Sequence, residues 1–347
     1  MAGREAQPPW RRNRIGLLYI VTVRHNGRED SCVEWLFIVN PVAGRGRTGR
    51  LWPEIEKTIR SRGIPMQVAL TTAPGEATGI AREAADRAVV AIIGVGGDGT
   101  TGEIANGVLS SRHPETQVGV IPTGTGNDFV RGQGIPLSYE YSLEAILKGC
   151  PALPVDLVEV EDAAKNRRYA VNSVGIGFDA YVAHMAHSRR WLKRLGPLAY
   201  AFGAVGALIT FRTTDARVLI DGQTAHSDGT WLAACTNTER LAGGMQICPG
   251  ADCHDGKLNL CLVSGIPPLR VLQLMVLSFK GKHAGQPGVH LLSGQEVLVS
   301  AERPLPVHID GDPVPFQLPL TLRVHAGAIR LLTPPPVKGK EGRAGDR

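Results

Sequence analysis

Three glycine-rich turns constrain the fold of the first half of this chain, because each closely follows a short apolar run. The turns occupy residues 40–44 (Asn-Pro-Val-Ala-Gly), 94–100 (Gly-Val-Gly-Gly-Asp-Gly-Thr) and 122–128 (Pro-Thr-Gly-Thr-Gly-Asn-Asp). Brief, mostly β-branched apolar runs are typical of strands buried on both faces, and they occupy residues 35–39, 67–70, 89–93 and 118–121. Helical patterns lie between them at residues 51–62, 76–87 and 103–111. This alternation predicts a parallel sheet covered by helices on both faces.

After Pro151 the pattern changes to alternating strands with few helices. The strand candidates are residues 153–160, 169–175, 217–220, 230–235, 257–263, 296–301, 307–309 and 320–324. Helical stretches are expected at about 180–210 and 268–280. Such spacing favours an antiparallel sandwich. The predicted organisation is an N-terminal extension of uncertain order (1–33), an α/β domain (34–150), a β-sandwich-rich domain (151–332) and a disordered tail (333–347).

The formal net charge of +6 sits mainly in the two tails. Residues 1–14 carry +3 and residues 333–347 carry +2, so the rest of the chain is near neutral. The body has no basic stripe interleaved with aromatic residues, which argues against a nucleic-acid partner. Loose attraction to an anionic membrane surface fits this distribution equally well.

The six cysteines form no CxxC pair and no disulfide framework, which predicts a reduced, cytoplasmic protein. Cys248, Cys253 and His254 have irregular spacing for zinc, and no second ligand pair follows them, so zinc is disfavoured. The apolar stretch 15–23 is too short for a membrane span and precedes no small-residue cleavage site, so an extra strand or an extension is expected there. A soluble or peripheral protein is therefore predicted.

The three turns favour a phosphate ligand. Glycine lets backbone amides approach a phosphate closely, and the helix starts behind the turns add oriented N–H groups. One such turn alone is more often a tight strand-to-helix connection; three on neighbouring strands indicate a polyphosphate. Neither GxxxxGK[ST] nor, at the first strand, GxGxxG is present, so the P-loop and dinucleotide fingerprints are missing.

A carboxylate within the second turn indicates a cation. Asp98 would repel a bound phosphate unless Mg²⁺ lay between them, and Mg²⁺ prefers a few carboxylates with water and nucleotide phosphates. Asp128 and Asp156 also stand at predicted loop ends and are candidate partners in holding the ion. For these two, ordinary helix capping or turn formation is an equal alternative.

The motifs together resemble the diacylglycerol kinase catalytic-domain superfamily, particularly the bacterial YegS-like lipid kinases. The resemblance rests on the three turns, on Glu103 and Asn106-Gly107, and on the later motifs Val155-Asp-Leu157, Asn172-Ser-Val-Gly-Ile-Gly177, Gly243-Gly-Met-Gln-Ile-Cys-Pro249, Asp255-Gly-Lys-Leu258 and Ile309-Asp-Gly-Asp312. It extends over residues 36–332. The implied fold is a Rossmann-like nucleotide-binding domain of the NAD kinase and diacylglycerol kinase type, followed by a β-sandwich-rich domain.

The resemblance also implies roles for individual residues. Asp310 would be the general base, with Asp312 beside it, and Asp98 would act at the catalytic centre. Asp98, Asp128 and Asp156 would form the network around Mg²⁺, while Asp255 would help to hold a second, structural cation. Contacts with ATP are implied for Asn40, Pro41, Gly44, Thr71, Gly96, Gly97, Asp98, Gly99, Thr100, Glu103, Gly124, Thr125 and Asn127.

The activity implied is transfer of the γ-phosphoryl group of ATP to a hydroxyl of diacylglycerol or a related membrane lipid, in phospholipid metabolism. Two positions depart from the family pattern: Thr101-Gly102 replaces Leu-Asn, and Asp312 replaces Glu. Two alternatives remain, an NAD kinase and a nucleotide-binding regulator without catalysis. The enzyme is expected in the cytoplasm, at the inner face of the membrane, where its lipid substrate lies. A homodimer is one possible oligomeric state.

The segment 184–211 has two interpretations. Its basic residues, from His187 to Arg194, could contact anionic headgroups while its apolar residues line an acyl-chain groove. The alternative, a core helix with a solvated charged start, is somewhat favoured.

Overall fold

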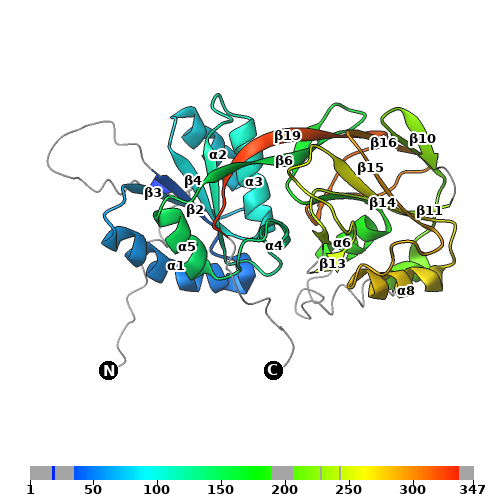
Figure 1. Cartoon of the computed structure of the whole chain (residues 1–347), viewed down its shortest axis with the longest axis horizontal. Coiled ribbons are helices and arrows are strands. Elements are labelled where there is room, and N and C mark those ends of the chain that lie inside the picture. Colours follow the sequence, from blue (N-terminus) through cyan, green and yellow to red (C-terminus); the bar gives the residue numbers. More distant parts are fainter. Residues whose placement is uncertain (1–17, 20–34, 189–205, 227–228, 242–243, 336–347) are drawn as a thin grey trace, which may run out of the picture.

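The first part of the molecule is a parallel sheet with helices on both faces, as predicted (Figure 1). The computed structural model describes residues 18–19, 35–188, 206–226, 229–241 and 244–335. Strands β1–β3–β2–β4–β5 adjoin in that order, and β2 to β5 run parallel. In chain order the elements are β1 (Leu18–Tyr19), β2 (Trp35–Val39), α1 (Ala43–Ser61), β3 (Met66–Leu70), α2 (Glu76–Asp86), β4 (Ala91–Gly96), α3 (Asp98–Leu109), β5 (Gln117–Pro122), α4 (Asp128–Gly132) and α5 (Tyr139–Leu147).

Strand β2 shows why the sheet is covered on both sides. Its residues are buried alternately on opposite faces, because successive side chains of a strand point in opposite directions. Phe37 and Val39 pack with residues of α1 and α5, whereas Leu36 and Ile38 pack with residues of α2 and α3. Residues 36–39 do not alternate between apolar and polar because both faces of the strand are covered. All four side chains are 0% exposed.

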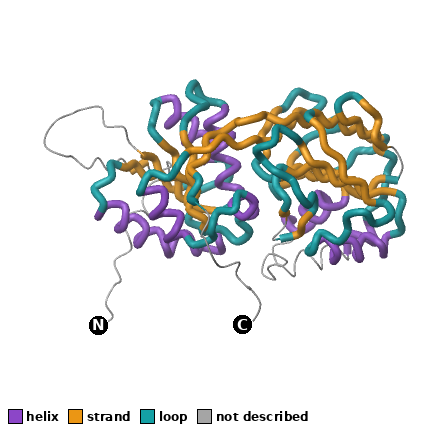
Figure 2. The backbone as a smooth tube through the Cα atoms, in the orientation of Figure 1, coloured by secondary structure: helices purple, strands orange, loops and turns teal. Residues whose placement is uncertain are grey.

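The second part is a β-sandwich, and Figure 2 shows that strands dominate it while helices gather in the first part. One layer is a six-stranded sheet in the order β15–β14–β11–β8–β17–β18, and the facing layer continues the large sheet through β19, β16, β9 and β10. The elements are β6 (Ala152–Glu161), β7 (Arg167–Ala170), β8 (Ser173–Gly177), α6 (Phe178–Ser188), β9 (Ala216–Ile220), β10 (Gln223–His226), β11 (Thr230–Thr236), β12 (Arg240–Leu241), β13 (Met245–Gln246), β14 (Leu258–Ser264), α8 (Pro268–Ser278), β15 (Val289–Gly294), β16 (Glu296–Ala301), β17 (Val307–Ile309), β18 (Asp312–Val314) and β19 (Leu320–Leu332).

Two long antiparallel strands, β6 and β19, connect the two parts (Figure 1). The first residues of β19 pair with β16, and its end returns to pair with β5 at Arg330 and Leu331. One sheet of 11 strands therefore runs through both parts of the molecule. None of the helices in the described part of the chain is long and apolar enough to span a bilayer.

Several elements differ from the sequence-based expectation, and two differences matter for the site. Helix α3 begins at Asp98 rather than Glu103, so the predicted second turn is divided between the end of β4, the N-cap Gly97 and the first turn of the helix. The strand expected over 169–175 is two strands, β7 and β8, which belong to different sheets. The expected helix over 180–210 is described only as α6 and a short helical stretch at 206–210; its basic centre lies outside the described residues.

Candidate functional site

The three predicted turns lie together at the carboxyl ends of β2, β4 and β5. A Cβ placed on Gly124 would lie 2.4 Å from the Cα of Gly97, so the second and third turns touch through their backbones. A Cβ placed on Gly44 would lie 2.3 Å from the carbonyl oxygen of Thr123. Gly44 also has φ +58°, which favours glycine. Because Gly44 and Gly124 have no side chains, the turns can approach each other this closely.

Hydrogen bonds connect the same turns. The side-chain amide of Asn40 donates to Thr100 Oγ1 at 3.2 Å, which ties the first turn to α3. The hydroxyls of Thr48 and Thr123 lie 2.6 Å apart and tie α1 to the third turn. The amides of Thr123 and Gly124 both donate to the carbonyl of Gly96. The N-terminus of α3, where the first amides have no partner within the helix, lies among these turns and suits an anion.

Two of the predicted nucleotide contacts have structural partners of their own. Both carboxylate oxygens of Glu103 accept amides at the start of α2, from Gly75 at 2.9 Å and Ala77 at 3.1 Å. The hydroxyl of Thr71 is buried and donates to the carbonyl of Val39 at 3.4 Å. Thr125, by contrast, is exposed on the third turn. Contacts of these residues with ATP stay predictions.

Asp98 and Asp128 both lie close to Gly126. A Cβ placed there would be 3.2 Å from Asp98 Oδ2 and 3.6 Å from Asp128 Oδ2. Desolvation is the main cause that raises the pKa of Asp98 to about 6, and the charges of Asp128 and Asp310 add to it. The amide of Phe129 donates to Asp98 Oδ1 at 3.0 Å and opposes the rise. The result is an acidic cluster beside the phosphate-type turns.

Asp310 belongs to a two-residue hairpin turn between β17 and β18. Asp310 and Gly311 have φ of 52° and 85°, as the central residues of type I′ turns require. The turn faces the first turn of α3: Asp310 Oδ2 lies 3.2 Å from the Cβ position of Gly102, and Asp312 Oδ2 lies 3.9 Å from that of Gly99. The two predicted catalytic carboxylates of the second part therefore meet the glycine-rich turns of the first.

Backbone amides hold the carboxylate of Asp310. Asn172 and Ser173 donate to Oδ1 at 2.8 and 3.0 Å, and Val171 donates to Oδ2 at 3.0 Å. Val171 and Asn172 are the two residues between β7 and β8, so the break in the predicted strand supplies two of these three donors, and Ser173 at the start of β8 supplies the third. Desolvation raises the pKa of Asp310, although the three amides oppose the rise.

The structure does not bring Asp156 into one ligand cluster with Asp98 and Asp128, while Asp255 was predicted for a separate, structural cation. Both oxygens of Asp156 accept backbone amides, from Gly256 at 2.8 Å and Gly327 at 2.7 Å. Asp156 therefore ties the Asp255-Gly256 turn to β19, and Asp255 itself accepts the amide of Lys257. Within the described residues, the one set of three metal-type side chains whose ligand atoms lie within 4.8 Å of one another is Asp252, Cys253 and His254. Only Cys253 and His254 of this set belong to the zinc site that the sequence disfavours.

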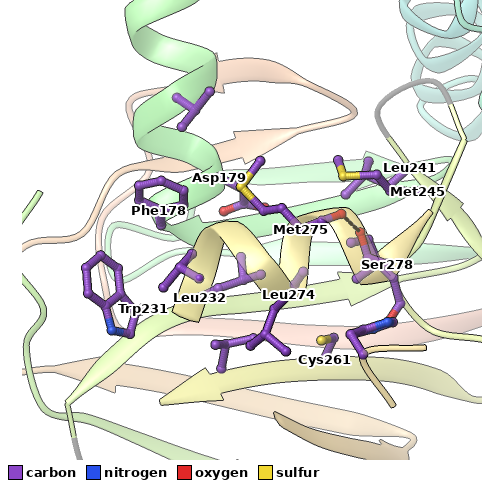
Figure 3. A pocket seen from close by; sticks show the side chains of 16 residues that line it. Phe178, Asp179, Trp231, Leu232, Leu241, Met245, Cys261, Leu274, Met275 and Ser278 are labelled. Carbon is purple, nitrogen blue, oxygen red and sulfur yellow. Dashed lines mark hydrogen bonds between the residues drawn. The ribbon is translucent and has the colours of Figure 1, made fainter. Parts of the chain in front are cut away.

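Two hollows lie close to the Asp310 turn. A cleft of about 2030 Å³, counted to its open mouth, is lined on the α/β side by residues that include Glu103 and Asn106, and on the sandwich side by Arg168, His184 and Asp312. A second, apolar pocket of about 660 Å³, with the open solvent at its mouth included, lies in the sandwich (Figure 3). Its wall includes Phe178, Trp231, Leu241, Met245, Leu274 and Met275.

Sequence reasoning missed the pair Asp179 and His308. Asp179 lines the apolar pocket, and His308 Nε2 lies 3.0 Å from Asp179 Oδ2. The amide of Gly311 donates to His308 Nδ1 at 3.2 Å. Burial lowers the pKa of His308, but the charge and hydrogen bond of Asp179, together with the charges of Asp310 and Asp312, outweigh it and the net shift is upward. The one sequence signal was the position of Asp179 just after an apolar, glycine-rich strand.

The fold and the site define a kinase phosphotransferase built from a nucleotide-type domain and a β-sandwich, and comparison with known proteins agrees. The diacylglycerol kinase catalytic domain matches residues 34–160, and the YegS C-terminal NAD kinase beta sandwich-like domain matches residues 172–333. The diacylglycerol kinase of Staphylococcus carnosus is 30% identical over 310 residues, which are 88% of this chain and 96% of that protein. The diacylglycerol kinase of Bacillus subtilis is 28% identical over 277 residues, 79% of this chain and 88% of that protein.

The fold has a counterpart among solved structures. The crystal structure of a diacylglycerol kinase from Bacillus anthracis superposes with a TM-score of 0.67 at 23% identity, covering 88% of this chain and 98% of that one. The chain belongs to the diacylglycerol kinase family, as a YegS-like lipid kinase.

Proposed function

We propose that this kinase uses ATP and Mg²⁺ to phosphorylate a hydroxyl group of diacylglycerol or a related membrane lipid. The observation that carries the proposal is the approach of the Asp310 turn to the first turn of α3, with Asp310 Oδ2 3.2 Å from the Cβ position of Gly102. A proton acceptor thus stands beside the turns that suit a triphosphate. Relatives described as diacylglycerol kinases support the choice of acceptor.

The backbone of the three turns would bind the phosphates. Phosphoryl transfer asks mainly for positioning and for stabilisation of negative charge on the moving group. Oriented amides at the start of α3 and in the third turn provide both, because they are held in place by hydrogen bonds such as that of Asn40 to Thr100. The departure at Gly102 lets Asp310 lie close to α3, because a Cβ there would be only 3.2 Å from Asp310 Oδ2.

The donors at Asp98 and Asp128 fit a magnesium ion. Both carboxylates approach the same side-chain position of Gly126, and Mg²⁺ is commonly bound by one or two carboxylates together with substrate phosphates. The pKa of Asp98 is raised first by burial and then by the charges of Asp128 and Asp310, and a cation would stabilise the ionised form of this carboxyl. When bound, Mg²⁺ would neutralise negative charge on the phosphates of ATP during transfer. Asp156 would act indirectly, because both of its oxygens accept backbone amides.

Asp310 would accept the proton of the attacking hydroxyl. A carboxylate whose pKa is raised is a better base near neutral pH than an ordinary one, and the three amides keep it in one orientation. The acyl chains would occupy the apolar pocket of Figure 3. Asp179 lines that pocket and bonds His308, which contacts the Asp310 turn, so the pocket and the proposed base are separated by one hydrogen-bonded pair.

Incubation with γ-labelled ATP tests the proposal. The protein is given a total lipid extract, purified diacylglycerol or NAD, with and without Mg²⁺. We expect label in a lipid, dependent on Mg²⁺, and none in NAD. Labelled NADP would instead make this chain an NAD kinase. Measurable ATP binding with no labelled product from any lipid would favour the non-catalytic regulator.

A further inference from the structure

Helix α8 carries an exposed apolar stripe. Leu269, Val276 and Phe279, the residue that follows the helix, are 80%, 72% and 55% exposed. Leu269 and Val276 are seven residues apart and Phe279 follows three later, so the three lie along one side of the helix axis. Of the seven large hydrophobic residues that are exposed in the described chain, three are on this one element. Single exposed apolar residues are ordinary, but a stripe of them marks an interaction surface.

The opposite side of α8 forms a wall of the apolar pocket. Val271, Leu274, Met275 and Ser278 line it, and Figure 3 shows the last three on the helix among the other lining side chains. One helix therefore separates the proposed acyl pocket from the exposed stripe. In Figure 1, α8 lies on the side of the sandwich opposite the β6 and β19 strands, which join it to the first part of the molecule.

The segment of chain that carries the stripe has charge of one sign. Residues 256–295 contain no Asp or Glu, and they contain four Lys or Arg residues. Lys280 and Lys282, directly beyond Phe279, are both exposed. The sequence is otherwise near neutral outside its tails, so this is a local concentration of positive charge next to exposed apolar side chains. That combination suits a surface with negative headgroups above an apolar layer.

We propose that the outer face of α8 docks on a bilayer that contains anionic lipid. Leu269, Val276 and Phe279 would enter the acyl boundary of the bilayer, while Lys280 and Lys282 would contact the headgroups. The inference rests on the proposed function, because it explains how a pocket inside the sandwich reaches a substrate that does not leave the membrane. The competing occupant is a second copy of the chain. Two copies that met through this stripe would bring two positively charged surfaces together, which is unfavourable.

Vesicle co-sedimentation without nucleotide tests the docking surface. The full chain is mixed with phosphatidylcholine vesicles that contain or lack phosphatidylglycerol. We expect binding to the anionic vesicles, weakened by salt, and at least a ten-fold loss of affinity in Val276→Asp/Phe279→Asp. Leu153→Asp, an exposed leucine on β6, is the matched control and should bind like the unchanged protein. Equal binding by the α8 variant would overturn the proposal.

Two further measurements separate docking from folding, from self-association and from the proposed activity. The variant should phosphorylate water-soluble dihexanoylglycerol normally and lose activity only on long-chain diacylglycerol in vesicles, because none of its changed residues lines the pocket. Loss of both activities in the variant would overturn the proposal. No activity of the unchanged protein on either substrate would contradict the proposed function, yet leave the vesicle result standing. Sedimentation velocity that shows a dimer broken by the same substitutions, with no vesicle binding, would assign the stripe to a second copy instead.

Discussion

His308 and Asp179 form a buried pair that joins the apolar pocket to the Asp310 turn. Their side chains approach to 3.0 Å between Nε2 and Oδ2. Because the amide of Gly311 donates to Nδ1, that nitrogen is an acceptor, and the proton of the neutral ring is on Nε2, facing Asp179. The pair thus orients a residue adjacent to the proposed base without contacting the reacting atoms.

Gly175→Ala should separate this pair without changing either member. Gly175 is the β8 residue opposite His308, and a Cβ there would lie 2.0 Å from Asp179 Oδ2 and 2.3 Å from His308 Nε2. We expect kcat to fall roughly 10- to 100-fold, as small misplacements of catalytic groups do, with the KM for ATP unchanged. Asp179→Asn, which keeps a hydrogen-bond acceptor, should retain more activity. Steady-state kinetics measure kcat, and thermal unfolding measures stability. A lower unfolding temperature of Gly175→Ala together with a normal kcat would contradict the positioning role.

Asp310→Asn should remove lipid phosphorylation and leave ATP binding intact. The amide cannot accept the hydroxyl proton, and loss of a general base typically costs about 10²- to 10⁴-fold in rate. ATP affinity should persist, because the three turns and α3 hold the nucleotide in our proposal. Calorimetric titration with ATP and a lipid kinase assay measure the two properties separately. Asp312→Asn is the matched comparison, and normal turnover by Asp310→Asn would move the role of base to another residue.

Asp98→Asn should stabilise the metal-free protein above pH 6. The pKa of Asp98 is raised from 3.8 to about 6, so the folded state binds the proton more tightly than the unfolded state. The free energy of unfolding of the unchanged protein therefore falls, relative to that of the variant, as pH rises from about 4 to about 6. The total change in this difference is up to ~3 kcal/mol. Denaturant unfolding of both proteins across this range measures it. A difference that does not depend on pH would show that Asp98 is an ordinary carboxyl.

The same variant tests the metal. Anything that binds only the folded state raises its stability. We expect Mg²⁺ with ATP to raise the unfolding temperature of the unchanged protein by several degrees and that of Asp98→Asn by much less. Equal shifts for the two proteins, in thermal unfolding with and without EDTA, would place the ion away from Asp98.

Gly124→Ala should damage the nucleotide site by steric overlap. Its Cβ would lie 2.4 Å from the Cα of Gly97, and both atoms belong to the backbones of turns that cannot move independently of β4 and β5. We expect a loss of roughly 1–3 kcal/mol in stability, as overpacking typically causes, and at least ten-fold weaker ATP binding. Gly79→Ala is the control, because its Cβ would meet no atom within 4 Å and alanine favours the helix. Unchanged ATP affinity in Gly124→Ala would show that the two turns do not share one ligand.

Local pattern was sufficient for the architecture of the first part and for its turns. Brief apolar runs such as 35–39 predict strands buried on both faces, and parallel strands bring the turns after them to one edge of the sheet. The three turns do meet there. The start of α3 was predicted at residue 103, five residues later than its actual start at Asp98. The glycines at 99 and 102 are typical of loops, although here they belong to the helix.

The sequence by itself determined the class of fold, the polyphosphate-type turns and the family resemblance, because these depend on short-range spacing. Only the tertiary structure decided that Asp310 approaches Gly102, that two residues between β7 and β8 hold its carboxylate, and that Asp179 meets His308. These contacts join positions more than a hundred residues apart in the chain. Their geometry depends on the register of antiparallel strands and on the long β6 and β19 pair, which no local periodicity specifies.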